Sequence, residues 1–221
     1  MTDEDLYRIW EKVPVNYYQK GIKSNIFQQI WHEQKIENAK KILSSLKFNN
    51  CLDVGCASGY MISEVAKSFP NKNFWGIDSF DKAIHYAKKH YRKINFKIAM
   101  AEKLPFKDES FDLVIFYETI EHLPKPAKAL QEIRRVLRPS GTLLLAMDSG
   151  NIFFRIIWLI WEKTKGSVWD GAHLNPFHHD ELESLIRKSE FKIENKQFTH
   201  LGLEVVFILS KNLHKRDPNF N

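Results

Sequence analysis

A loop of small residues that carries one carboxylate follows the first strongly apolar strand signal of the chain. The segment LDVGCASG (52–59) places Asp53 in the strand signal and Gly55, Ala57 and Gly59 at every second position after it. Small residues at a strand-to-helix turn let a ligand approach the backbone and the helix N-terminus closely. Asp53 would repel a pyrophosphate and attract an ammonium or sulfonium group. The alternative is a purely structural turn.

The spacing of this loop excludes two common nucleotide motifs. A dinucleotide fingerprint would need a third glycine where Tyr60 stands, and the Gly-Lys-Ser/Thr ending of a phosphate-binding loop is absent. The next strand signal, Phe74–Ile77, ends at Asp78. A carboxylate at that place can accept hydrogen bonds from both hydroxyls of a ribose. The alternative is that Asp78 only caps the following helix.

Histidines and tyrosines near the predicted strand ends are the candidate acid–base groups. We select His122 and His178 as the catalytic candidates. The alternative for His122 is a packing or capping role, and the alternative for His178 is that it begins the helix near Asp180. The full set of candidates is His122, His173, His178, His179, Tyr17 and Tyr18.

Helix and strand signals alternate along the chain from about residue 50 onward, which predicts a parallel sheet with helices on both faces. The last two strands are close in sequence, so we expect one of them to be antiparallel. The predicted fold is therefore an α/β, Rossmann-like three-layer sandwich with a mostly parallel seven-stranded sheet whose last strand is antiparallel. Strands are expected at 51–55, 74–77, 95–99, 111–116, 142–147, 192–198 and 204–209, and helices at 24–47, 59–68, 80–91, 126–137, 151–163 and 180–189.

The composition is that of a soluble globular protein. The chain has 221 residues, 43 % hydrophobic and 27 % charged, enough for one large domain with a proper core. The net charge of +6 is spread along the chain and forms no basic block, which argues against nucleic acid as a partner. Cys51 and Cys56 form no CxxC pair, so a structural zinc site or a redox pair is not expected. The acidic N-terminus does not resemble a signal peptide, so we expect a cytoplasmic location.

Four motifs in a fixed order resemble one family, the class I S-adenosylmethionine (SAM)-dependent methyltransferases. The similarity is to the group that includes ubiquinone-biosynthesis enzymes and many other small-molecule and lipid methyltransferases. It covers residues 50–148 tightly and 173–182 loosely. The motifs are LDVGCASGY (52–60), WGIDSF (75–80), AEKLPFKDESFDLVI (101–115) and ETIEHLPKPAKALQEIRRVLRPSGTLLLA (118–146).

The resemblance implies SAM as cofactor and assigns its contacts. The loop from Asp53 to Gly59 would surround the methionine part, Asp78 the ribose and residues 100–102 the adenine, while Tyr117 and Glu118 would close over the methionine end. Two residues depart from the family pattern: Ala57 replaces a glycine, and Met100 replaces an aspartate that would pair with the adenine amino group. The expected cofactor-binding residues are Asp53, Gly55, Cys56, Ala57, Gly59, Asp78, Ser79, Met100, Ala101, Glu102, Tyr117 and Glu118.

The same resemblance implies a function, with its alternatives, and a division of the chain into parts. The expected function is methyl transfer to a small-molecule acceptor, with lipid-like or prenylated molecules among the candidates. The alternatives are an RNA or metal-assisted O-methyltransferase, with Glu118, Glu121 and His122 as metal ligands, or a non-catalytic SAM-fold binding module. The expected parts are a helical cap (1–49), a SAM-binding core (50–149), a lid or substrate insertion (150–179), a C-terminal helix and strand pair (180–211) and a tail (212–221).

The most apolar stretch, Ile152–Trp161, lies in the expected insertion. It is too short to span a bilayer and contains Arg155. Three alternatives stay open for it: a buried helix, a cover over an apolar substrate, or peripheral membrane contact through its tryptophans. The N-terminal helix, with Phe27, Ile30 and Trp31, is expected to form the other wall of the acceptor pocket.

Overall fold

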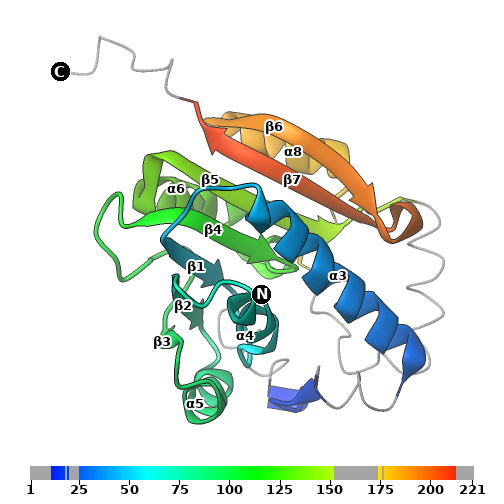
Figure 1. Cartoon of the computed structure of the whole chain (residues 1–221). Helices are drawn as coiled ribbons and strands as arrows, with labels where there is room; N and C mark the ends of the chain where they lie inside the picture. The colour runs from blue at the N-terminus through cyan, green and yellow to red at the C-terminus, as the bar shows by residue number, and fades with distance from the viewer. Residues whose placement is uncertain (1–10, 18, 20–24, 152–173, 176, 213–221) are drawn as a thin grey trace.

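The computed structural model describes residues 11–17, 19, 25–151, 174–175 and 177–212 (Figure 1). The strands are β1 (Asn50–Val54), β2 (Asn73–Asp78), β3 (Asn95–Ile98), β4 (Phe111–Tyr117), β5 (Leu137–Asp148), β6 (Phe191–Thr199) and β7 (Glu204–Lys211). The helices are α3 (Ile26–Ser44), α4 (Tyr60–Lys67), α5 (Asp81–His90), α6 (Pro126–Val136) and α8 (His179–Lys188), with the short 3₁₀ helices η1 (Ile120–His122) and η3 (His200–Gly202).

These strands form one seven-stranded sheet in the order β3-β2-β1-β4-β5-β7-β6. The pairs from β3 across to β5 are parallel, while β7 runs antiparallel to both of its neighbours, β5 and β6. The prediction of a mostly parallel seven-stranded sheet with an antiparallel last strand is confirmed. The antiparallel β7 begins at the sheet edge where the parallel strands end, because Asp148 at the end of β5 pairs with Glu204 at the start of β7.

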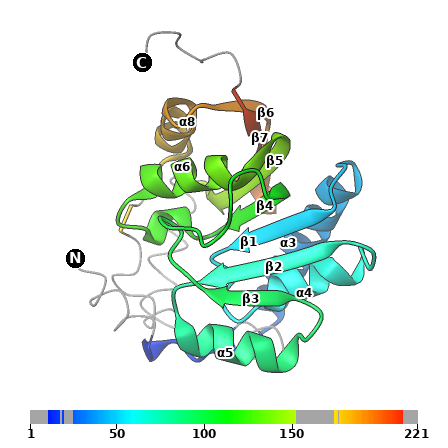
Figure 2. The same cartoon turned by 90° about the vertical axis from the view of Figure 1, so that its left-hand side faces the viewer.

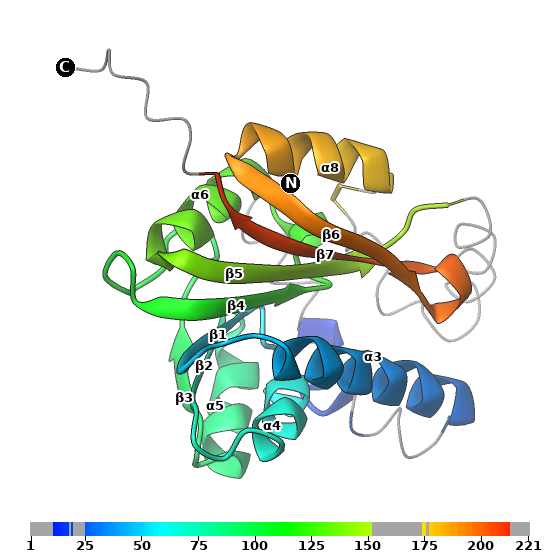
Figure 3. The ribbon, with the colours of Figure 1, turned by 45° about the horizontal axis from the view of Figure 1, so that its top comes forward.

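Helices cover both faces of the sheet, which makes the three layers seen in Figures 2 and 3. Successive strand residues point to opposite faces. In β4, for example, Val114 and Phe116 pack in the core beneath α6 and α8, while Leu113 and Ile115 pack in the core beneath α3, α4 and α5. The central strands are buried on both faces, which explains their continuous apolar sequences.

The element boundary that differs most from the prediction is the start of β5. The predicted helix 126–137 ends at Val136, and β5 begins at once with Leu137 rather than at Thr142. The pairing between β4 and β5 shifts from Phe111–Leu137 to Leu113–Thr142, so β5 bulges between these pairs. Pro139 lies in that bulge, where the lack of a backbone N–H is tolerated.

Two further expectations concern the membrane. The stretch Ile152–Trp161, and with it the predicted helix 151–163 apart from Asn151, lies outside the described residues. Within the part of the chain that the structure describes, no helix combines the length and apolar character needed to cross a bilayer.

Candidate active site

Two cavities that share a wall lie at the carboxyl ends of the parallel strands. The large cavity has a volume of about 350 Å³ and extends from the loop after β1 to the ends of β2 and β3. The small cavity, of about 70 Å³, lies between the same loop and α3. Both cavities are lined by Gly55, Ala57, Ser58 and Glu118. A ligand at this wall would therefore contact the loop that the sequence singled out.

Asp78, at the end of β2, lies in the wall of the large cavity together with Ser79. One of its carboxylate oxygens accepts a hydrogen bond from Ala57 N at 2.8 Å, and the other accepts one from Phe80 N at 2.9 Å. Burial raises the pKa of Asp78, and these backbone bonds oppose that rise. The carboxylate thus joins the loops after β1 and β2 and keeps further lone pairs for a ligand with hydroxyl groups.

The far end of the large cavity is lined by Ala99, Met100, Ala101 and Glu102, which follow β3. Ala101 and Glu102 are buried, whereas Met100 is 42 % exposed. Ala99 N donates to Asp78 O at 3.0 Å, which fixes this segment against the end of β2. The three residues predicted to border adenine thus lie in one cavity with the carboxylate predicted to bind the ribose.

An N-terminal segment covers part of the large cavity from outside the sheet. Val13, Pro14, Val15 and Tyr17 form part of its lining. The segment is tied down by an ion pair of 2.6 Å between Glu11 and Lys82. The sequence predicts Tyr17 only as an acid–base candidate and does not indicate the other three, because a short apolar segment without periodicity gives no signal of its position.

Only glycine fits at position 55. Its φ of +78° is in the left-handed region, and a Cβ there would lie 2.2 Å from Thr119 Oγ1. Thr119 is held in place by donating to Tyr117 O at 2.8 Å. Gly55 therefore lets the loop after β1 approach the loop after β4, which brings Glu118 to the shared wall. Gly59, in contrast, faces Ala87 and Phe96, on the side where α4 meets its neighbours.

Asp53 is a buried carboxylate that lines the small cavity and is 4 % exposed. No donor among the described residues makes a hydrogen bond to it. Burial, with a smaller contribution from Asp78, raises the pKa of Asp53 to about 8. Cys56 and Tyr117 line the same cavity, and the Tyr117 hydroxyl has no hydrogen-bond partner in the described structure. A cationic group of a ligand would balance the negative charge of Asp53.

A lysine from α3 supplies the positive charge at the small cavity. Lys35 pairs with Glu118, and its Nζ lies 3.5 Å from Glu204 Oε1. Burial would raise the pKa of Glu118, but Lys35 lowers it to about 2. Conversely, burial would lower the pKa of Lys35, but Glu118 and Glu204 raise it above its ordinary value. Nothing in the sequence indicates the roles of Lys35 and Glu204, since neither stands in a recognisable motif.

Two more carboxylates lie near this ion pair. Glu121 in η1 is buried, and its Oε2 atom has no hydrogen-bond partner among the described residues. Burial, and to a lesser degree Glu118, raises the pKa of Glu121 to about 8. Burial and the neighbouring Glu118 and Glu121 raise the pKa of Asp148 well above its ordinary value. With a pKa of about 8, Glu121 therefore holds a proton at neutral pH.

The predicted histidines occupy different places. His122 lines the large cavity near Glu118. His178 instead caps α8: its Nδ1 accepts from Asp180 N at 3.4 Å, and its backbone N donates to Glu181 at 2.9 Å. This is the helix-start alternative stated for it. His173 and Tyr18 lie outside the described residues.

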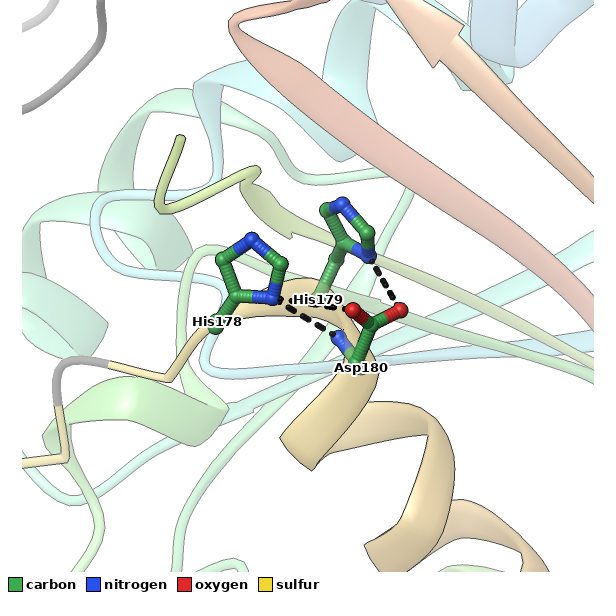
Figure 4. A group of neighbouring side chains, drawn as sticks. All are labelled: His178, His179 and Asp180. Atoms are coloured by element: carbon green, nitrogen blue, oxygen red, sulfur yellow. Dashed lines mark hydrogen bonds and ion pairs between the residues drawn. The ribbon is translucent and has the colours of Figure 1, made fainter. Parts of the chain in front are cut away.

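Among the residues that the structure describes, the potential metal ligands that come together are His178, His179 and Asp180, not Glu118, Glu121 and His122 (Figure 4). The ring nitrogens of the two histidines lie 3.3 and 2.9 Å from Asp180 carboxylate oxygens. The Lys196 ammonium is 3.2 Å from the same His179 Nδ1, and the positive end of the helix dipole is adjacent. Hydrogen bonding at a helix start accounts for this group without an ion.

The fold and the site together define a class of protein. The chain combines a sheet in this order with a small-residue loop after β1, a carboxylate at the end of β2 and a cavity between them, and it shares its fold with solved structures described as SAM-dependent methyltransferases. A solved structure from Thermotoga maritima, described as a SAM-dependent methyltransferase and possible histamine N-methyltransferase, matches 93 % of this chain and 99 % of its own length. The TM-score is 0.70 and the identity 22 %.

The sequence comparisons identify the family. Residues 52–145 match the model of a family described as a methyltransferase domain. A probable SAM-dependent methyltransferase from Mycolicibacterium smegmatis is 28 % identical over 65 % of this chain and 52 % of its own length. A demethylmenaquinone methyltransferase from Chlorobaculum tepidum is 29 % identical over 60 % of this chain and 55 % of its own length. Residues 52–145 therefore carry a class I SAM-dependent methyltransferase domain, and the chain spans about half the length of the curated relatives it matches.

Proposed function

We propose that this chain transfers the methyl group of SAM to a small-molecule acceptor. The observation that carries the proposal is Asp53, a buried carboxylate that faces a cavity and has no donor among the described residues. Such a group is costly to keep unless a ligand compensates it. SAM carries both a sulfonium and an ammonium group, and the wall shared by the two cavities brings Asp53 and Asp78 into reach of one extended ligand.

The residues present fit this cofactor. In the proposed pose the adenosine part occupies the large cavity, with Asp78 accepting from the ribose hydroxyls and residues 99–102 beside the base. The methionine part then lies toward the shared wall, near Asp53 and Glu118. Met100 offers no carboxylate to the adenine amino group, so backbone groups or the buried Glu102 take that role.

The chain's own residues then have three tasks. When bound, SAM supplies a methyl group activated by the positive charge on sulfur. Asp53 loses its proton as the cation binds and balances its charge. Val13, Pro14 and Val15 close the large cavity against water, and the acceptor must be held in line with the methyl group. His122, in the same cavity wall, is the proposed proton acceptor for an O–H or N–H group of the acceptor.

The relatives support a small-molecule acceptor, because one of them is described as acting on demethylmenaquinone. The finer proposal of a lipid-like or prenylated acceptor rests on the apolar stretch Ile152–Trp161 and stays a prediction. The alternative of an RNA acceptor is disfavoured, because the sequence contains no basic block.

The test is transfer of label from methyl-labelled SAM into three fractions: polar metabolites, a total lipid extract and total RNA. We expect label in one of the first two. The variant Asp53→Asn should lower the transfer about 10- to 100-fold, the effect of losing one charge-assisted contact. Asp112→Asn is the matched control, because Asp112 binds Asn49 N and Asn50 N at the start of β4, at the other end of the sheet. Label in RNA alone would contradict the acceptor class, and label in no fraction would contradict the activity.

A further inference from the structure

Helix α3, outside the sheet, sends one lysine into the protein interior beside the cavities. Lys35 is 3 % exposed, pairs with Glu118 at the end of β4 and lines the small cavity. Its Nζ also lies 5.6 Å from the centroid of the Trp31 ring. A buried ammonium is expensive unless it is paired, so this position requires both carboxylates that surround it, Glu118 and Glu204.

Glu118 is held in a backbone conformation that points to a functional role. Its φ of +45° is uncommon for a residue with a side chain, and its N–H donates to Ala146 O at 2.8 Å. A conformation of this kind costs about 1–2 kcal/mol and persists only where the surroundings enforce it. It directs the residue into the wall of both cavities, next to Gly55 and Ala57.

The other end of the ion pair is fixed as well. Glu204 accepts a hydrogen bond from Thr199 Oγ1, and its Oε2 lies 3.1 Å from His200 Nδ1. The opposite nitrogen of His200 lies 3.0 Å from Trp31 O, which returns the chain of contacts to α3. Because Glu204 is fixed by these contacts, Lys35 is held in place beside it. Lys35 in turn holds the Glu118 carboxylate.

We propose that Lys35 is a positioning residue for the cofactor: it fixes the Glu118 carboxylate in the wall shared by the two cavities, directed at the cationic part of SAM. This inference rests on the proposed function. Nothing in the four sequence motifs assigns a role to Lys35, which precedes the first motif in the N-terminal cap.

The electrostatics of the surroundings show what Lys35 prevents. Burial raises the pKa of Glu118, and Lys35 is the main group that lowers it, with His32 and His122 adding smaller effects. Burial lowers the pKa of His32 to about 4, so this ring is neutral at physiological pH. Without Lys35, Glu118 would take up a proton as the pH falls. The titratable and charged groups around Glu118 are Lys35 and His32 of α3, Asp53 of β1, Tyr117 of β4, Glu121 and His122 of η1, Asp148 of β5 and Glu204 of β7.

The experiment is the affinity for SAM, measured by calorimetry between pH 5.5 and 8.5, in the wild type, Lys35→Met and Lys35→Arg. The readout is the ratio of the variant's Kd to that of the wild type at each pH, which cancels the titration of Asp53. For Lys35→Met the ratio should be at least about 10 and should rise further as the pH falls, because a neutral Glu118 no longer attracts the cation. Lys35→Arg keeps the charge and should stay within about threefold at all pH values.

Two further variants keep the test decisive. In a Glu118→Gln background, Lys35→Met should have little additional effect, because the group through which Lys35 acts is gone. This double variant also removes Lys35 and Glu118 as a pair, while Glu204 keeps its contacts to Thr199 and His200, so it offers a second measurement if Lys35→Met alone does not fold. A ratio that is constant with pH, or a Lys35→Met effect that persists in full in the Glu118→Gln background, would show a merely structural role and overturn the inference. Failure of the wild type to bind SAM would instead overturn the proposed function.

Discussion

The two cavities hold their carboxylates by different physical means. Asp78, in the large cavity, is fixed by two backbone N–H groups from the loops after β1 and β2. Glu118, in the shared wall, is fixed by the side chain of Lys35 from a helix outside the sheet, and Asp53 in the small cavity has no donor among the described residues. The large cavity is thus built by the backbone, and its geometry follows from the strand order. The small cavity depends on charge, so its state depends on pH and on a bound ligand.

Asp78→Asn tests the backbone-built side and should have the largest effect on the affinity for SAM. The amide would direct N–H groups at Ala57 N or Phe80 N and would offer a ribose fewer acceptors. We expect the affinity for SAM to fall about 100-fold, the loss of one to two charge-assisted hydrogen bonds, together with a lower Tm. Calorimetry and thermal unfolding measure the two effects.

Asp112→Asn is again the matched control, because Asp112 also accepts two backbone N–H bonds, each of 2.9 Å. It should lower Tm without changing the affinity for SAM. Equal losses of affinity in both variants would contradict a specific role for Asp78.

Gly55→Ala tests whether the shared wall needs the close contact between two loops. The new Cβ would meet Thr119 in a backbone region that alanine rarely adopts, and we expect a loss of about 3 kcal/mol in the free energy of unfolding. The same change at Gly202 measures the cost of backbone strain alone, because φ is +89° there but the atom nearest to the new Cβ is 3.9 Å away. Gly202→Ala should cost about 1 kcal/mol. Similar costs in urea unfolding for both variants would show that contact with Thr119 is unimportant.

Glu121→Gln tests the charge-dependent side through stability. The pKa of Glu121 is raised from 4.5 to about 8 in the folded protein. Below pH 4.5 the group is protonated in both the folded and the unfolded states, and as the pH rises from 4.5 to 8 its buried neutral form increasingly opposes folding. The loss is at most about 1.4 kcal/mol per pH unit.

The glutamine variant is free of this loss. Its free energy of unfolding relative to wild type should therefore increase between pH 5 and pH 8, as measured by urea unfolding at both values. An unchanged difference would show that Glu121 is not held neutral by burial.

The difference between the cavities also explains what could be predicted from the sequence. The sheet, the loop from Asp53 to Gly59 and the position of Asp78 follow from local patterns, in which residues close in sequence are also close in space. The structure brings most of the predicted cofactor residues to the cavity walls, with Gly59 packed between helix and strand instead.

The remaining part of the site depends on contacts between distant segments. Lys35 and Glu118 are 83 residues apart, and His200 and Trp31 are 169 apart. A lysine within a helix with many charged residues gives no sign that it is buried. His178 is a similar case, since a histidine before an acidic helix start has the pattern of a cap as well as that of a base.

The central claim is that the buried carboxyl group of Asp53 loses its proton when SAM binds and balances the charge of the cationic part of SAM. Calorimetric titration with SAM at pH 7, in two buffers of different ionisation enthalpy, measures both the affinity and the protons released. Because the pKa of Asp53 is about 8 before binding, we predict release of about one proton per SAM bound by the wild type. Asp53→Asn should release correspondingly less and bind at least 10-fold more weakly. The same affinity and the same proton release in both proteins would contradict the account.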